Sequence, residues 1–492
     1  MKKSQPLEST ELDRCVELLE SIAADHTRLA AVDRDLRRRL VTAAGQISRP
    51  DKLAKRALAS ALWRRERDER RRHDTALLER TGTRVLRRAS VYPTPLPGAI
   101  TTSPPRRSGE DELHEPRKCY VCKAPFDRVH FFYDSMCAPC ADLNWTKRCQ
   151  TADLGGRVAL VTGARVKIGY QTAIMLLRAG ARVIATTRFP RDAARRYARE
   201  PDFREWGNRL AIHGIDLRHT PSVETLCREL LDRRDRLDFI INNACQTVRR
   251  PVGFYDHLMD GETAPPSPAE QPLLDHQAHL TATTALATRH LLVDSARASQ
   301  VALLEEDLRR GPGIFPSGQL DADLQQVDLR GRNSWRLTLA EVPSVELLEV
   351  HLVNAVAPFV LNARLKPLML RHPTRDRHIV NVSAMEGQFY REFKTDKHPH
   401  TNMAKAALNM MTRTSAVEYV RDGIHMNSVD TGWVTDEDAA PLADRKRKEH
   451  GFHPPLDVVD GAARILDPIF SGFLTGEHVW GLFLKDYQPA PW

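Results

Sequence analysis

Four cysteines between residues 119 and 140 are the first group whose spacing could do chemistry. Cys119 and Cys122 form one pair, Cys137 and Cys140 form a second, and fourteen residues separate the pairs. Two tight turns of this kind can present four thiolates tetrahedrally, as structural Zn²⁺ requires. A disulfide pair or free thiols are disfavoured, because the other cysteines are scattered singly and no secretory signal is visible. We expect a zinc ion with no open coordination position, in a module that braces its neighbour.

A turn with two glycines follows the apolar segment VALV. Thr162 and Gly163 end that segment, and Lys167, Ile168 and Gly169 open a predicted helix. Glycine lets the backbone turn tightly against a pyrophosphate, and the helix start offers N–H groups and the positive end of its dipole. The pattern predicts a phosphate-bearing cofactor, although a glycine pattern alone has low specificity.

Apolar segments alternate with amphipathic helical segments after residue 155. Strands are expected at residues 158–161, 181–187, 210–215, 237–243 and 378–383, and helices at residues 170–178, 221–231, 348–370 and 401–419. Thr220 is expected to cap the second of these helices, and Pro221 to be its first residue. Strands that alternate with helices indicate an α/β fold with a Rossmann-like, doubly wound parallel sheet.

Several segments resemble motifs of the short-chain dehydrogenase/reductase family, in the family's order, over about residues 155–492. TGARVKIG at 162–169 is similar to the family's TGxxxGIG loop. NNAC at 242–245 is similar to its NNAG, and IHMNSVDTG at 424–432 to the segment that borders the nicotinamide. The resemblance implies a Rossmann-like fold and hydride transfer between a nicotinamide and a carbonyl or alcohol substrate.

The resemblance also implies roles for single residues. Asp216 would lie at the adenine edge and Asn243 beside the cofactor, while the glycine turn receives the pyrophosphate. Ser383 would hold the substrate oxygen, and Asn354 would position a water that relays protons. Lys405 would bind the nicotinamide ribose, and its charge would influence the protonation of nearby groups.

One active-site position departs from the family pattern. The family has a tyrosine four residues before the lysine, where this chain has Thr401. A threonine hydroxyl has a far higher intrinsic pKa than a phenol, so it does not inherit general acid/base work near neutral pH. His398, His400 and Tyr390 lie nearby and are the other candidates to complete the proton transfer. The alternative is that both histidines are surface loop residues.

Two basic residues bear on the choice of cofactor. Lys167 stands where the family loop usually has its middle glycine, and Arg188 follows the second predicted strand. An NAD site needs an acidic residue after that strand to hold the ribose hydroxyls, whereas an arginine can pair with a 2′-phosphate. NADP is therefore favoured over NAD. The alternative is a solvated arginine on a basic surface.

About a hundred residues separate the NNAC segment from Asn354, where the family has a short loop. Residues 250–340 are therefore expected to be an insertion. Residues 273–308 are helical by periodicity, and the glycines at 311–318 break the pattern. The insertion leaves the carboxyl ends of the strands, so we expect a lid or a substrate wall there. An interaction surface is the alternative.

The N-terminal third is rich in arginine. Residues 1–90 show apolar positions at helical spacing, such as Leu12 and Val16, and are expected to form packed helices. Residues 91–115 are expected to be a linker, residues 116–150 the zinc module and residues 151–492 the Rossmann-like domain. Basic helices beside a zinc module suggest nucleic-acid binding, but interleaved acidic residues favour self-paired charges on solvated helix faces.

Composition agrees with a protein of two or three domains. The chain has 492 residues, 41% hydrophobic content and a formal net charge of +9. Neither a signal segment nor a membrane-spanning run is visible, so we expect a cytoplasmic protein with no membrane partner. A small-molecule substrate is expected, and whether the chain forms a homo-oligomer is left open.

Together these features predict an NADP-preferring oxidoreductase of the short-chain type. A cofactor-binding sensor or scaffold without redox turnover is the second hypothesis, supported by the loss of the tyrosine. Retention of Asn354, Ser383 and Lys405 speaks against it. The third hypothesis is nucleic-acid binding through the N-terminal region, which would weaken steeply with salt.

Overall fold

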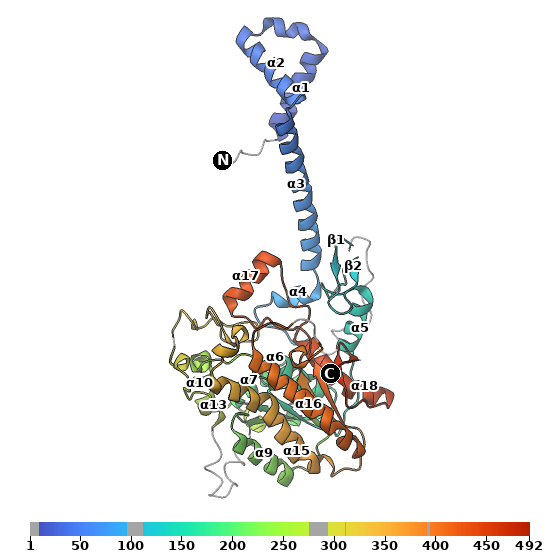
Figure 1. Cartoon of the computed structure of the whole chain (residues 1–492), viewed down its shortest axis with the longest axis vertical. Coiled ribbons are helices and arrows are strands. Elements are labelled where there is room, and N and C mark those ends of the chain that lie inside the picture. Colours follow the sequence, from blue (N-terminus) through green and yellow to red (C-terminus); the bar gives the residue numbers. More distant parts are fainter. Residues whose placement is uncertain (1–8, 96–111, 275–293, 310, 391–393) are drawn as a thin grey trace. The chain divides into compact units, whose positions relative to one another are not determined.

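The computed structural model describes residues 9–95, 112–274, 294–309, 311–390 and 394–492. The chain divides into two compact units, Met1–Thr75 and Ala76–Trp492. The second unit contains an eight-stranded sheet with helices packed around it (Figure 1). The strand order is β10-β9-β8-β7-β6-β3-β4-β5, and all pairs are parallel except β10 with β9. This confirms the expected α/β, Rossmann-like fold. The strands are β3 (Val158–Thr162), β4 (Arg182–Thr187), β5 (Leu210–Gly214), β6 (Phe239–Asn242), β7 (Arg377–Ser383), β8 (Ile424–Asp430), β9 (Phe483–Lys485) and β10 (Gln488–Ala490).

Both faces of the sheet are covered by helices, as strands that are buried on both faces require. A hydrophobic core lies on each face of the sheet. Successive residues of β3 point to opposite faces, so Leu160 packs in one core and Val161 in the other. The core on the Val161 side is closed by α6 (Lys167–Arg178), α7 (Pro190–Ala198) and α18 (Val458–Thr475). The core on the Leu160 side is closed by α9 (Thr220–Arg233), α15 (Ala357–Met369) and α16 (Pro399–Arg421).

Two predicted helix boundaries differ from the structure. Helix α9 begins at Thr220 rather than Pro221, with His219 as its N-cap, because the His219 carbonyl accepts from the N–H of Ser222 and its ring Nδ1 lies 2.7 Å from Ser222 Oγ. The segment expected as one helix at 348–370 is α14 (Ser344–His351), a π-helical turn η7 (Leu352–Val356) and α15.

The segment from Ser344 to Met369 also reaches a mean hydropathy of 1.5, a level that would permit a membrane span by length and composition. Half of it is buried inside the second unit, where α15 packs on the sheet. Among the described residues it is the one helical segment that meets this test.

The expected insertion is mostly irregular where it is described. It contains η3 (Val252–Tyr255), α10 (Asp256–Thr263), α13 (Ser295–Ala298), η4 (Glu305–Leu308), η5 (Ser334–Arg336) and η6 (Leu339–Glu341). The continuous helix expected at 273–308 is therefore wrong for residues 294–308, and residues 275–293 lie outside the described part. Asp307 explains the break, because its buried carboxylate accepts from the N–H groups of Leu303 and Leu304 and pairs with Arg249.

The four cysteines belong to a small module within the second unit. It contains α4 (Gly82–Arg87), β1 (Glu112–Lys118), which pairs with β2 (Pro125–Arg128) in an antiparallel ribbon, and α5 (Ala138–Cys149). Strand β1 thus begins inside the segment expected as a linker, and residues 96–111 lie outside the described part. The module shares one hydrophobic core with Leu456, Val458 and Val459 of the Rossmann-like domain. Helix α17 (Ala440–His450) lies between β8 and α18 in the chain.

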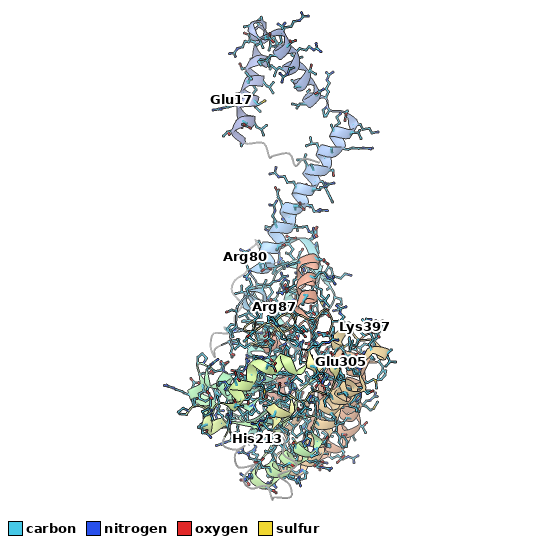
Figure 2. All side chains as sticks on the ribbon, turned by 90° about the vertical axis from the view of Figure 1, so that its left-hand side faces the viewer. Glu17, Arg80, Arg87, His213, Glu305 and Lys397 are labelled. Carbon is cyan, nitrogen blue, oxygen red and sulfur yellow. The ribbon has the colours of Figure 1, made fainter. Side chains whose placement is uncertain are left out.

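The first unit is helical, as its sequence pattern indicates, but its helices are not packed. It comprises α1 (Ser9–Ala24), η1 (His26–Ala31), α2 (Arg34–Ser48) and most of α3 (Lys52–Glu79). No side chain of residues 9–75 is buried, and side chains such as Glu17 extend away from the ribbon (Figure 2). Arg65 pairs with Glu69 at 2.9 Å and Arg70 with Glu66 at 2.5 Å, each four residues apart. A small part of the basic charge is thus paired with acidic residues on solvated helix faces.

Three histidines cluster at the amino ends of β7 and β8. From this cluster we expect the protein to lose stability in acid. The fully buried His378 ring lies 5.0 Å from the His478 ring and 5.3 Å from the His425 ring, centroid to centroid. Burial, together with the neighbouring histidines, holds the pKa of His378 well below its usual value, and burial also lowers the pKa of His425 and His478. Protonation therefore favours the unfolded chain, so this stability is complete above about pH 6.5 and decreases as the pH falls.

We expect the free energy of unfolding in urea to fall by about 2–4 kcal/mol between pH 7.5 and pH 5.5. His378→Phe removes the most deeply buried of the three bases and should reduce this loss by about 1 kcal/mol. His372→Phe, outside the cluster, is the matched control. An equal acid loss in His378→Phe and in the unmodified chain would contradict the assignment.

Candidate active site

The predicted site residues gather at the carboxyl ends of the parallel strands. Ser383 ends β7 and is the register partner of Asp430, which ends β8. Thr162 ends β3, and Asn243 follows β6, the strand next to β3 in the sheet. Ligands of open α/β sheets bind at this edge, so the topology brings together residues that the sequence separates by more than two hundred positions.

The predicted phosphate turn is built by Thr162, Gly163, Gly169 and Asn243. The Asn243 side chain donates to the carbonyls of Thr162 and Gly163, at 3.1 and 3.2 Å, and the N–H of Ala244 donates to Thr162 Oγ1 at 3.0 Å. Gly163 has φ +67°, and a Cβ there would lie 2.8 Å from Ala244 Cα. A Cβ on Gly169 would lie 2.3 Å from the Asn243 amide nitrogen. Only glycine fits at both positions.

Helix α6 opens directly after this turn, at Lys167. Its N-cap, Val166, supplies no side-chain hydrogen bond, so the first N–H groups of the helix depend on another acceptor. Lys167 has φ +55°, a left-handed conformation that glycine adopts more easily and that costs a lysine about 1 kcal/mol. Ile168 contributes its backbone to the turn, while its side chain packs towards α18.

Arg188 and Asp216 follow β4 and β5. Arg188 donates to the Tyr255 hydroxyl at 2.6 Å and lies over that ring at 4.6 Å. Asp216 is buried and accepts from Arg218 at 2.6 Å. Burial acts to raise the pKa of Asp216, but the hydrogen bonds from Arg218 and the charge of Arg188 hold it below its usual value. Asp216 is therefore an ionised group already paired with an arginine.

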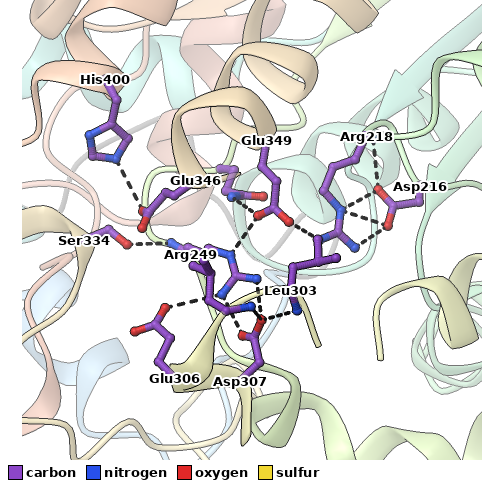
Figure 3. A network of polar contacts seen from close by, with 12 residues as sticks. Asp216, Arg218, Arg249, Leu303, Glu306, Asp307, Ser334, Glu346, Glu349 and His400 are labelled. Carbon is purple, nitrogen blue, oxygen red and sulfur yellow. Dashed lines mark hydrogen bonds and ion pairs between the residues drawn. The ribbon is translucent and has the colours of Figure 1, made fainter. Parts of the chain in front are cut away.

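A polar network leads from Asp216 through Arg218 to Glu349 (Figure 3), and Gln246 extends it to the predicted catalytic Asn354. Arg218 donates to Glu349 of α14 at 2.8 Å, and Gln246 donates to the same carboxylate at 3.1 Å. The backbone of Gln246 then bonds both ends of the Asn354 amide, at 3.0 and 3.2 Å. The π-helical turn η7 places Asn354 for this double contact, and such turns are frequent at functional sites.

The insertion is anchored in the same network. Arg249 donates to Glu349 at 3.0 Å and to both oxygens of Asp307 at 2.6 and 2.7 Å, and its N–H donates to Ser334 Oγ (Figure 3). A cavity of about 330 Å³ lies beside it. It is lined by Asp216, Arg218, His219, Ala298, Leu303, Val345, Leu348, Glu349 and Leu352.

Ser383, Thr401 and Lys405 form the polar centre of the site. Thr401 and Lys405 lie one turn apart on α16 and so share a face. Lys405 is buried, and its ammonium donates to the Val382 carbonyl at 2.7 Å, next to Ser383. The hydroxyls of Ser383 and Thr401 are buried and have no hydrogen-bond partner among the residues that the structure describes. A buried hydroxyl that makes no hydrogen bond costs about 1–3 kcal/mol of stability. These two hydroxyls therefore suit a polar ligand that would bond them.

The three other proton-donor candidates differ in position. His400 is 1% exposed, and its Nε2 lies 3.4 Å from Oε1 of the buried Glu346 of α14 (Figure 3). His398 is also buried and stacks on Trp335 of the insertion at 3.8 Å, and burial lowers its pKa. Tyr390 is 48% exposed. The surface-loop interpretation of the histidines is wrong, because α14 and the insertion cover them.

Glu346 and Asp430 were not predicted from the sequence. Glu346 and Glu349 are two carboxylates three residues apart in the apolar segment SVELLEVH, which is the signal that could have identified them. Asp430 ends β8 beside Ser383 and accepts from the N–H of Gly432 at 3.0 Å. Burial raises the pKa of Asp430 to about 6, so it is poised to exchange a proton near neutrality.

The four predicted metal ligands converge. The Sγ atoms all lie within 4.8 Å of one another in the group Cys119, Cys122, Cys137 and Cys140. Backbone N–H groups of the two cysteine turns lower the pKa of Cys119 to about 7, although burial acts to raise it. Four thiols this close together, with backbone donors directed at Cys119 and Cys137, are a donor set that fits Zn²⁺.

Family comparisons match the Rossmann-like domain in two parts. A family model described as short chain dehydrogenase matches residues 157–258, and one described as Enoyl-(Acyl carrier protein) reductase matches residues 331–456. The gap between the two matches falls within the segment expected as an insertion.

The relatives differ in how much of this chain they match. An uncharacterised protein of Acanthamoeba polyphaga mimivirus is 31% identical over 370 residues, which cover 72% of this chain and 71% of that protein. Retinol dehydrogenase 14 of Mus musculus is 38% identical over 20% of this chain and 34% of that enzyme. Dehydrogenase/reductase SDR family member 13 of Bos taurus is 36% identical over 21% and 28%, respectively. The match therefore spans about a third of the length of the named dehydrogenases.

Solved structures include similar chains at low identity. The RhlG/NADP active-site complex of Pseudomonas aeruginosa is 18% identical, with a TM-score of 0.42 over 68% of this chain and 95% of that one. A dehydrogenase/reductase from Sinorhizobium meliloti 1021 is 19% identical, with a TM-score of 0.41 over 68% and 94%, respectively.

Proposed function

We propose that the chain is a member of the short-chain dehydrogenase/reductase family, as the matches at residues 157–258 and 331–456 support, and that it is an NADP(H)-dependent oxidoreductase acting on a carbonyl or alcohol group. The observation that carries the proposal is the group of Ser383, Thr401 and Lys405 at the ends of the strands. Both hydroxyls are buried and have no hydrogen-bond partner among the described residues, and the Lys405 ammonium bonds the carbonyl next to Ser383. Such a group suits a substrate oxygen that gains or loses a proton.

The residues present fit a nicotinamide dinucleotide. The glycine turn and the uncapped start of α6 suit the pyrophosphate, and Lys167 adds a positive charge there. Arg188 keeps further guanidinium donors for a 2′-phosphate beyond the one bound to Tyr255. Asp216 and the cavity beside it suit the adenine edge, and Lys405 suits the ribose. When bound, this cofactor would supply or accept the hydride.

The Glu346–His400 pair is our proposed source of the proton. His400 precedes Thr401 in the chain and lies 3.4 Å from the buried Glu346 carboxylate. An imidazole can act as a general acid where a threonine alone cannot. Thr401 would pass its hydroxyl proton to the substrate oxygen while it takes one from His400, so no charge develops on threonine. Ser383 would hold the same oxygen, and Asn354 would keep its place through Gln246.

His400→Gln should lower kcat about 10²–10³-fold. The assay is NADPH oxidation with a panel of aldehydes and ketones that includes retinal, chosen from the named relatives. Glu346→Gln should cause a smaller loss of kcat. His398→Gln is the matched control. An unchanged kcat in His400→Gln would reject this donor, and loss of activity in His398→Gln alone would transfer the role to His398.

We also propose that the four cysteines hold one structural Zn²⁺. Four protein thiolates complete the tetrahedral shell, so the metal would stabilise the module without taking part in the reaction. The aromatic side chains of Phe132, Tyr133 and Trp145 cover the centre, as so small a module needs.

A further inference from the structure

The first cysteine turn contacts the loop that follows β8. Tyr120 lies between Cys119 and Cys122, and its hydroxyl oxygen accepts a hydrogen bond from the N–H of Trp433 at 2.9 Å. Gly432 has φ +75°, and a Cβ there would lie 3.1 Å from the same hydroxyl oxygen. The Gly432–Trp433 turn therefore fits closely against Tyr120, and a larger residue at 432 would push the two apart.

This turn borders the candidate active site. Strand β8 ends at Asp430, the register partner of Ser383, and the N–H of Gly432 donates back to the Asp430 carboxylate at 3.0 Å. The contact with Tyr120 thus begins two residues beyond the strand position that lies beside the reacting centre. A displacement of Trp433 would change the wall of the site at this point.

Helix α5, which carries the last cysteine of the cluster, supplies a second attachment. Arg148 donates to Asp457 at 2.6 Å and to Asp460 at 2.9 Å, and Arg464 donates to Asn144 Oδ1 at 2.6 Å. All five side chains are buried, so these contacts are strong and directional. They fix α18 to the cysteine module.

Helix α18 in turn contacts the phosphate turn. A Cβ on Gly461 would lie 3.0 Å from Ile168 Cδ1, and Ile168 packs against the hydrophobic core that the module shares with α18. The module therefore touches both sides of the site: the phosphate turn through α18, and the turn after β8 through Tyr120.

We propose that the four-cysteine centre positions the oxidoreductase site, with Tyr120 as the positioning residue of the Gly432–Trp433 turn. The inference rests on the proposed function for the identity of that site. Zinc binding would draw the two cysteine turns together and fix Tyr120 between two ligands. Loss of the metal would free the first cysteine turn and with it Tyr120. Zinc binding in the module would thus control the shape of the oxidoreductase site, which itself contains no metal.

Hydrogen exchange of the full chain tests the proposal without an activity assay. In Tyr120→Phe, which keeps all four cysteines, we expect zinc to be retained and the Trp433 amide to exchange about tenfold faster. Removal of zinc from the unmodified chain by a chelator should have the same effect, and re-addition of zinc should reverse it. Tyr170→Phe is the matched control, because its hydroxyl contacts Glu200 and Arg196 rather than Trp433. Peptides from α9 serve as the internal reference.

NADPH affinity measured on the same samples separates the two proposals. Faster Trp433 exchange and weaker NADPH binding in Tyr120→Phe would support both. Faster exchange in a chain that binds no NADPH would support the coupling between metal and turn and overturn the proposed function. Unchanged Trp433 exchange in both Tyr120→Phe and the zinc-free chain would overturn the coupling, whatever the NADPH result.

Discussion

Replacing Lys405 with methionine is expected to lower kcat/KM about 10³-fold. Methionine keeps the buried stem of the side chain but removes the ammonium beside Ser383 and Thr401. The charge that would stabilise a developing oxyanion is then lost, together with the hydrogen bond to the Val382 carbonyl at 2.7 Å. Turnover is measured as NADPH oxidation with the carbonyl panel.

The lost hydrogen bond should also cost about 1–3 kcal/mol of stability, because the Val382 carbonyl is buried. Urea unfolding of the variant separates this cost from the effect on turnover. Lys397→Met, in the loop before α16, is the matched control and should retain activity within about twofold. A Lys405→Met enzyme that keeps turnover within about tenfold of the unmodified chain would remove Lys405 from the mechanism.

Cys140→Ser should have the largest effect on stability. We expect the unmodified chain to contain one zinc per molecule by elemental analysis, and the variant to contain none. Binding of structural zinc is coupled to folding, so the module should lose on the order of 5–10 kcal/mol. Because α5 carries both Cys140 and the buried contacts to α18, the Rossmann-like domain should be destabilised as well.

Cys149→Ser is the matched control for the zinc experiment. Cys149 ends the same helix and is partly buried, but it lies outside the four-cysteine cluster. It should retain zinc and unfold at nearly the unmodified denaturant concentration. A Cys140→Ser chain that keeps its zinc, or loses it without any change in unfolding, would contradict a structural centre.

The parts of the molecule that could be predicted depend on local sequence. The strands around Leu160 and Ile240 are short apolar runs, and such runs with intervening amphipathic helices specify a parallel sheet. The glycine turn and the cysteine pairs are also local, because their spacing alone sets the geometry. These are the features where the sequence and the structure agree.

The remaining features depend on contacts between distant segments. The burial of His400 requires Glu346 of α14, and that of His398 requires Trp335 of the insertion. The break in the expected insertion helix follows from Arg249, which draws Asp307 inward from 58 residues away in the chain. Periodicity carries no information about such partners.

The π-helical turn at Asn354 could not be predicted, because it too depends on a contact with a distant segment. It replaces regular helix within a continuous apolar pattern, and the contact that places its asparagine comes from the distant Gln246. The first unit shows the opposite case, where helical periodicity is present but no packing partner lies among its described residues.

The most direct test of the account is a fluorescence titration of the purified full chain with NADPH and with NADH. We expect NADPH to bind at least about tenfold more tightly than NADH, and Arg188→Ala to remove that difference by weakening NADPH alone. Tight NADPH binding without turnover on any carbonyl would favour a sensor over an enzyme. Equal affinity for the two cofactors would contradict the NADP assignment, and no binding of either would contradict the central claim.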